Sequence, residues 1–218
     1  MARTLLPMTS TLAPPTAVRR RSLVPVVVLA AAGPTAVAVL RGVLPYSTND
    51  DPLTAATSAA AHPGAQSAVL WLSYLALLTL PLGVVIVGRA AVRAHRVLGG
   101  IAAGLTWVGY ASLFWLAAPD QLAAAGLPPT EVAAAAEGIG AHPTQSVAAG
   151  AFVIGHIVGT VLLGVALWRA VPRWAAVALI ASQPLHLVFA VVVPNHLLDA
   201  CAWALTAAGF AVAAGVRR

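Results

Sequence analysis

Six long apolar stretches, separated by short polar segments, dominate this chain. They cover residues 23–45, 67–88, 99–118, 147–168, 175–193 and 197–216. Each is close to the roughly 20 residues that an α-helix needs to cross about 30 Å of hydrocarbon. The pattern predicts an all-α fold, a polytopic membrane helix bundle with six transmembrane helices.

The composition indicates a surface that faces lipid. The chain is 60% hydrophobic and only 8% charged, whereas soluble domains carry roughly 25% charged residues. Its 12 basic residues are all arginine and are scattered among the apolar stretches. This distribution argues against nucleic acid as a partner and favours the lipid bilayer. Arginine without lysine, together with abundant alanine, is typical of a GC-rich bacterial genome, so we expect a bacterial inner-membrane protein.

The arginines alternate with the apolar stretches. They precede the first stretch, separate the second from the third and the fourth from the fifth, and end the chain. The other connecting segments carry Asp and Glu instead. Because cytoplasmic loops are enriched in basic residues, both termini are expected in the cytoplasm. Arg41, near the outer end of the first stretch, is the one exception.

The N-terminal segment allows two interpretations. Residues 1–22 contain three prolines and little periodicity, which is typical of a disordered tail, here on the cytoplasmic side. The basic run at its end, followed by a short apolar core and small residues, also fits a cleavable signal peptide, even a twin-Arg one. Since the apolar run continues to about Pro45, a spanning helix is favoured. Residues 23–216 are then expected to form a single transmembrane domain.

A phrase repeated at an offset of 80 residues divides this domain. In each copy, His-Pro is followed after 25 residues by Arg-Ala: His62-Pro63 with Arg89-Ala90, and His142-Pro143 with Arg169-Ala170. Proline suits the first helical position, so each phrase predicts the outer start of a spanning helix, preceded by a short helix near the membrane surface. The chain is therefore interpreted as a duplicated hairpin plus a third one, at about 23–96, 99–173 and 175–216. His62 and His142 are expected to cap helices, the alternative being a metal or proton site shared by the repeats.

Polar groups at membrane depth are costly and suggest function by default. Those of this chain fall in the outer half of the predicted bundle: Arg41, His156, Gln183, His186, His196 and Asp199. The inner half has only its rim of arginines, so we predict a polar cavity that opens outward. His196 and Asp199, spaced three apart, are expected to form a local pair. Gly155 and Gly159, beside His156, are expected to allow close approach of a neighbouring helix.

Three functions remain open at this point. The first is binding or transport of a small solute, a proton or a metal ion, with His156 and His186 as a relay and His62, His142, His196 and Asp199 as metal ligands. The second is electron transfer through a single b-type haem held by His156 and His186. The third is a non-catalytic accessory role, in which the histidines only join helices. No HExxH, nucleophile elbow, P-loop or dinucleotide-binding motif occurs, so no enzyme chemistry is predicted.

Overall fold

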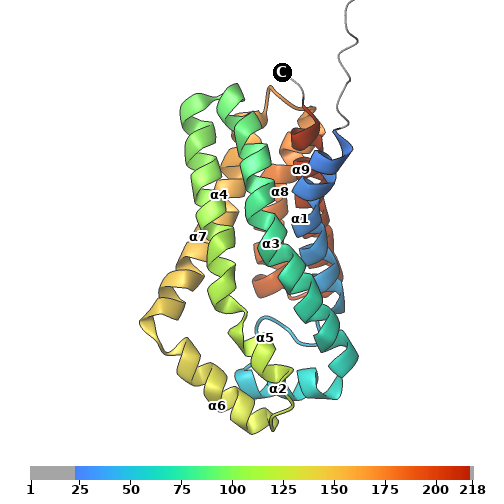
Figure 1. Cartoon of the computed structure of the whole chain (residues 1–218), viewed down its shortest axis with the longest axis vertical. Coiled ribbons are helices and arrows are strands. Elements are labelled where there is room, and N and C mark those ends of the chain that lie inside the picture. Colours follow the sequence, from blue (N-terminus) through green and yellow to red (C-terminus); the bar gives the residue numbers. More distant parts are fainter. Residues whose placement is uncertain (1–22, 217–218) are drawn as a thin grey trace, which may run out of the picture.

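The computed structural model describes residues 23–216, and every regular element in that range is helical (Figure 1). The predicted N-terminal tail lies outside the described residues. Six long helices are apolar and long enough to cross a membrane, which confirms the predicted six-span, all-α bundle. They are α1 (Val24–Val43), α3 (Pro63–Ala94), α4 (Arg96–Leu116), α7 (Pro143–Leu167), α8 (Arg173–Leu187) with the π-helical turn η1 (Val188–Val192), and α9 (His196–Gly215).

The six long helices form a closed ring. Each packs mainly against two others, in the order α1, α3, α4, α7, α8, α9 and back to α1. The α4–α7 contact is the most extensive, and glycine makes it possible. A Cβ at Gly155 would lie 2.7 Å from the Cα of Gly109, and one at Gly159 would lie 2.5 Å from the backbone nitrogen of Thr106. These distances confirm the predicted close approach beside His156.

Three short helices cover one end of the ring (Figure 1). They are α2 (Pro52–Ala61), α5 (Ala118–Ala123) and α6 (Pro129–Gly140), and they pack on one another. Helix α2 begins because Asp51 caps it, accepting the backbone N–H groups of Leu53 and Thr54 at 3.0 Å, and because Pro52 fits the first turn. As predicted, a short helix precedes each His-Pro phrase.

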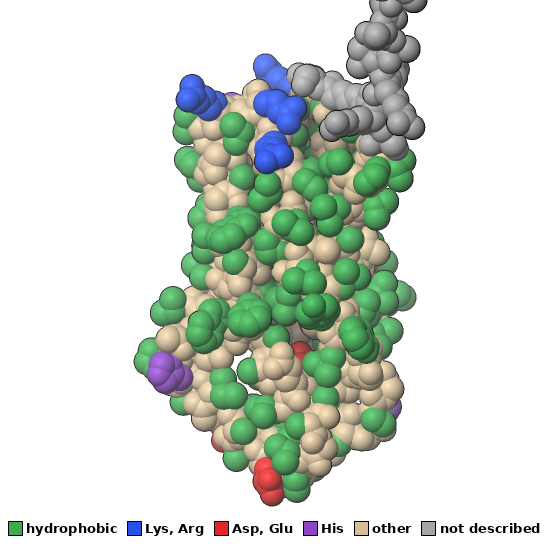
Figure 2. All heavy atoms as spheres, viewed as in Figure 1, with side chains coloured by type: hydrophobic (Ala, Val, Ile, Leu, Met, Phe, Trp, Pro, Cys, Tyr) green, Lys and Arg blue, Asp and Glu red, His purple; other side chains and the backbone are tan. Residues whose placement is uncertain are grey.

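Charge separates the two ends of the molecule. Figure 2 shows arginines at the end opposite the short helices, a broad hydrophobic belt, and acidic side chains at the other end. The arginines belong to the α3–α4 and α7–α8 connections, and the acidic residues to the segments around α2, α5 and α6. We call these the arginine end and the acidic end.

Candidate functional site

A cavity of about 540 Å³ lies inside the acidic end. Its walls come from α1, α3, α4, the 44–51 connection and the three short helices, and α7, α8 and α9 each contribute one lining residue. The space-filling view is hollowed at this level, with an acidic side chain visible inside (Figure 2). Among the lining residues are apolar Val37, Leu40, Ala76, Leu77, Leu113 and Phe152, and polar or aromatic Arg41, Tyr46, Thr48, Asp50, Ser73, Asp120, His186 and Trp203. The cavity is therefore a mainly apolar chamber with a few polar groups, as small-molecule sites are.

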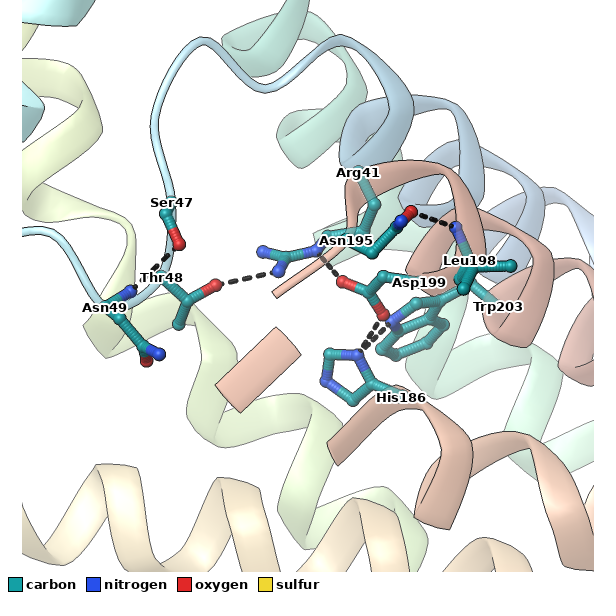
Figure 3. A network of polar contacts seen from close by, with 9 residues as sticks. All are labelled: Arg41, Ser47, Thr48, Asn49, His186, Asn195, Leu198, Asp199 and Trp203. Carbon is teal, nitrogen blue, oxygen red and sulfur yellow. Dashed lines mark hydrogen bonds and ion pairs between the residues drawn. The ribbon is translucent and has the colours of Figure 1, made fainter. Parts of the chain in front are cut away.

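Asp199 lies at the centre of a polar network on the side of the cavity that faces the middle of the bundle, which we call the floor (Figure 3). Because Figures 1 and 2 draw the acidic end at the bottom, the floor is the upper side of the cavity in those views. The Asp199 carboxylate accepts the Nε–H of Arg41 on one oxygen and contacts Nδ1 of His186 with the other. Asp199 is fully buried, whereas the Arg41 and His186 side chains are 14% and 13% exposed. The second guanidinium arm of Arg41 donates to the Thr48 hydroxyl at 2.7 Å. A buried carboxylate is tolerated only when it is paired in this way.

Helix ends place both partners of this ion pair. Asn195 caps α9, accepting the N–H of Leu198 at 3.0 Å, so Asp199 falls in the first turn, where the helix dipole favours negative charge. Arg41 falls in the last turn of α1, where positive charge is favoured. Since α1 and α9 pack side by side, the two charges meet. The arginine that broke the alternation of the sequence is thus explained by its partner.

His186 has two competing partners on one nitrogen. Its Nδ1 contacts the Asp199 carboxylate and also lies 3.1 Å from the indole Nε1 of Trp203. An indole N–H can only donate and a carboxylate can only accept. A protonated Nδ1 therefore bonds Asp199, and an unprotonated Nδ1 bonds Trp203. Proton position on His186 selects between the two contacts.

His156 lies beneath this floor, in the centre of the bundle. Its ring centroid is 5.6 Å from that of His186 and 6.1 Å from that of Trp203, and it stacks on Phe152 at 4.1 Å. Its Nδ1 bonds the backbone carbonyl of Phe152, so Nδ1 carries a proton, and in the neutral ring Nε2 is an acceptor. That Nε2 is buried and has no hydrogen-bond partner among residues 23–216. In its neutral form, His156 therefore presents an acceptor without a partner in the described chain, next to the floor.

The polar interior ends near the middle of the bundle. Gln183 is fully buried and donates to the Thr206 hydroxyl at 2.7 Å, away from the cavity lining. On the side of the arginine end, the core consists of large, fully buried apolar side chains: Leu80, Leu163, Leu167, Leu179 and Phe210. The cavity is closed in that direction.

The remaining predicted candidates, His196, His62 and His142, do not join the network at the floor. Asp199 pairs with Arg41 and His186 instead of the predicted neighbour His196, because its side chain points into the bundle interior while His196 remains partly exposed. His62 and His142 occupy the N-cap positions of α3 and α7. Within the described chain, no three His, Cys, Asp or Glu side chains are grouped to hold a metal ion. The described residues therefore contain no group of side chains that supports the predicted metal site.

A second polar group, which the sequence did not predict, lies in the part of the cavity wall formed by Tyr46 and Asp120. The Tyr46 hydroxyl donates to Oδ1 of Asp120, and Nε2 of Gln66 donates to the Asp120 carbonyl at 3.0 Å and to Oδ1 at 3.3 Å. Burial and the Asp120 carboxylate raise the pKa of Tyr46 far above its ordinary value, so the phenol remains a donor. Tyr46 and Asp120 are 74 residues apart, so no local motif could have revealed the group.

The haem hypothesis gains nothing from this packing. A macrocycle between His156 and His186 would have to displace Trp203, whose ring lies 5.2 Å from His186 and 6.1 Å from His156. His156 is also stacked on Phe152, with the ring centroids 4.1 Å apart, which leaves no room for a macrocycle on that face. Comparison of the chain with known protein families, with curated proteins and with solved structures gives no match.

Proposed function

We propose that this multi-pass membrane protein binds a small solute in the cavity at its acidic end. The observation that carries the proposal is the joining of a 540 Å³ chamber to the Arg41–Asp199–His186 network at its floor. Chambers of about 300–1,000 Å³ with few, well-placed polar groups are typical of small-molecule sites. A chain that needed only to pack helices would have no use for a buried carboxylate at this depth.

The proposed orientation places the arginine end in the cytoplasm. Basic loops are retained on the cytoplasmic side, so the cavity would open to the opposite side of a bacterial inner membrane. Because large apolar side chains close the bundle below His156, the described conformation would load from that side only. Transport of the solute would require a second conformation in which this plug separates.

His186 is the floor residue whose contacts depend on the position of its ring proton. Its Nδ1 bonds Asp199 when protonated and Trp203 when not, and Nε2 of His156 is the nearby acceptor without a partner in the described part of the chain. A change of proton position would thus alter contacts on α8 and α9 at the cavity floor.

Thiol labelling tests whether the cavity is open to water. Cys201 is the only cysteine, so Cys201→Ser provides a background without thiols. Ser73→Cys lines the cavity, ten residues after the proline that begins its helix. Val153→Cys is the matched control, ten residues after Pro143 but on an exposed, apolar face.

A membrane-impermeant thiol reagent added outside intact cells should label Ser73→Cys and leave Val153→Cys unmodified, since a thiol facing lipid does not ionise or meet the reagent. Labelling of neither variant, with both proteins present in the membrane, would contradict an outward-opening cavity. Labelling of Ser73→Cys only in inverted vesicles would reverse the orientation.

A further inference from the structure

The charges around the cavity are unbalanced. Arg41 is the only arginine in its lining, and its charge is matched by Asp199 beneath it. Two further carboxylates, Asp50 and Asp120, also line the cavity. Neither forms an ion pair with a basic side chain among the described residues. The chamber therefore carries excess negative charge in a surrounding of low dielectric constant, which attracts a cation.

Asp120 is held in place but not saturated. Tyr46 and Gln66 both donate to its Oδ1, while no donor from residues 23–216 reaches Oδ2. The two bonds made by Nε2 of Gln66 also fix the orientation of its amide. The other amide atom, Oε1, is left buried without a hydrogen-bond partner in the described chain, on a side chain only 2% exposed. Of these two acceptors, only that of Asp120 belongs to a residue that lines the cavity.

The remaining walls suit an apolar body better than a hydrated ion. Tyr46, Phe152 and Trp203 present aromatic rings to the chamber, and aliphatic side chains such as Leu77 and Leu113 fill the space between them. Aromatic faces attract organic cations, whereas a divalent metal ion requires several oxygen or nitrogen ligands at once. No such group of His, Cys, Asp and Glu occurs within residues 23–216.

We propose that the solute of this cavity is a small organic cation, an ammonium group on an apolar body. This inference rests on the proposed function and names its substrate class. The ammonium group donates to Oδ2 of Asp120, with Asp50 adding attraction from the adjoining 44–51 connection. The apolar body packs on Phe152 and Trp203, above the floor. An anion of the same size meets two carboxylates and a guanidinium already bonded to Asp199 and Thr48.

Three probes of one shape and different charge test the inference. The purified full-length protein in lipid nanodiscs is titrated at neutral pH with benzylammonium, benzyl alcohol and benzoate, and heat is measured by calorimetry. We expect saturable binding of benzylammonium and little of the other two. Asp120→Asn should weaken benzylammonium binding by about tenfold or more, as loss of a charged hydrogen-bond acceptor does. Glu137→Gln, at an exposed position of the acidic end away from the cavity lining, should leave it unchanged.

The outcomes distinguish failure of the cation assignment from failure of the proposed solute-binding function. Binding of benzoate without benzylammonium, or equal affinity of Asp120→Asn and Glu137→Gln, overturns the cation assignment and leaves a solute-binding cavity standing. Absence of binding by all three probes, together with failure of Ser73→Cys to label, overturns the proposed function itself. Should Asp120→Asn fail to fold, Asp50→Asn takes its place, and an unchanged affinity in that variant likewise counts against the cation.

Discussion

Replacement of Asp199 by asparagine is expected to destabilise the bundle strongly. The substitution keeps the size of the side chain and removes its charge. It leaves the guanidinium of Arg41, only 14% exposed, without the carboxylate that it contacts, and it removes the anionic acceptor of His186. Breaking a buried ion pair from one side costs about 3–5 kcal/mol. We expect about 3 kcal/mol, the lower limit of that range, because Arg41 keeps its hydrogen bond to Thr48 and faces the cavity.

A double-mutant cycle makes this expectation quantitative. Arg41→Gln alone leaves the fully buried Asp199 with His186 as its remaining partner, so it too should be costly. Since either substitution removes the same ion pair, the double variant should cost less than the sum of the two, by about 1–3 kcal/mol. The free energies come from reversible unfolding by sodium dodecyl sulfate in mixed micelles, followed by circular dichroism.

Glu137→Gln serves as the control in this cycle, and as an exposed surface change it should shift the unfolding free energy by less than about 0.5 kcal/mol. The reasoning is refuted if Asp199→Asn is no more costly than this control. Strict additivity of Arg41→Gln and Asp199→Asn would equally show that the two side chains do not interact.

Two further predictions concern helix packing and capping. Gly159→Ala should lower the unfolding free energy by about 1–3 kcal/mol, because its Cβ would lie 2.4 Å from the Thr106 hydroxyl oxygen. Gly104→Ala, whose Cβ would have no atom within 4 Å, should not lower it. Equal effects of the two substitutions in the same micelle assay would contradict the close packing. Hydrogen bonds from Thr54 hold the pKa of Asp51 below its ordinary value. The stabilisation by Asp51 is therefore complete above its unfolded-state pKa and is lost as the pH falls through the folded-state pKa. Asp51→Ala should lower the melting temperature at neutral pH, and the difference from wild type should disappear in strong acid; a difference independent of pH would exclude the charged cap.

The bundle was predictable because its signals are local and redundant. An apolar run long enough to span a bilayer is read from consecutive residues, and the arginines repeat the same division of the chain. The glycines beside His156 needed no knowledge of the partner helix, since a missing Cβ permits close approach by any neighbour. What they could not specify was Gly109 and Thr106 on α4 as the surfaces that come close.

The polar partners were not predictable, because they join residues far apart in the chain. Arg41 and Asp199 are separated by 158 positions, and their sequence signals were only an unexpected arginine and a buried acid. The helical spacing of three between His196 and Asp199 predicted the wrong pair, since residues three apart share only part of a face and Asp199 points into the bundle interior. The spacing of residues along one helix indicates only which side chains of that same helix can meet. It carries no information on side chains that a second helix brings into the bundle.

The two segments that carry the repeated phrase differ at positions near the site. The offset of 80 that aligns the two His-Pro motifs places Ala76 opposite His156 and Leu80 opposite Thr160. All four are buried, and Ala76 lines the cavity while His156 lies under its floor. Histidine in both copies would fill the chamber and bury a second imidazole at a cost, whereas alanine in both would leave no acceptor beneath His186. The cavity and its polar floor thus involve positions at which the two segments differ, whereas the shared His62 and His142 occupy the N-cap positions of α3 and α7.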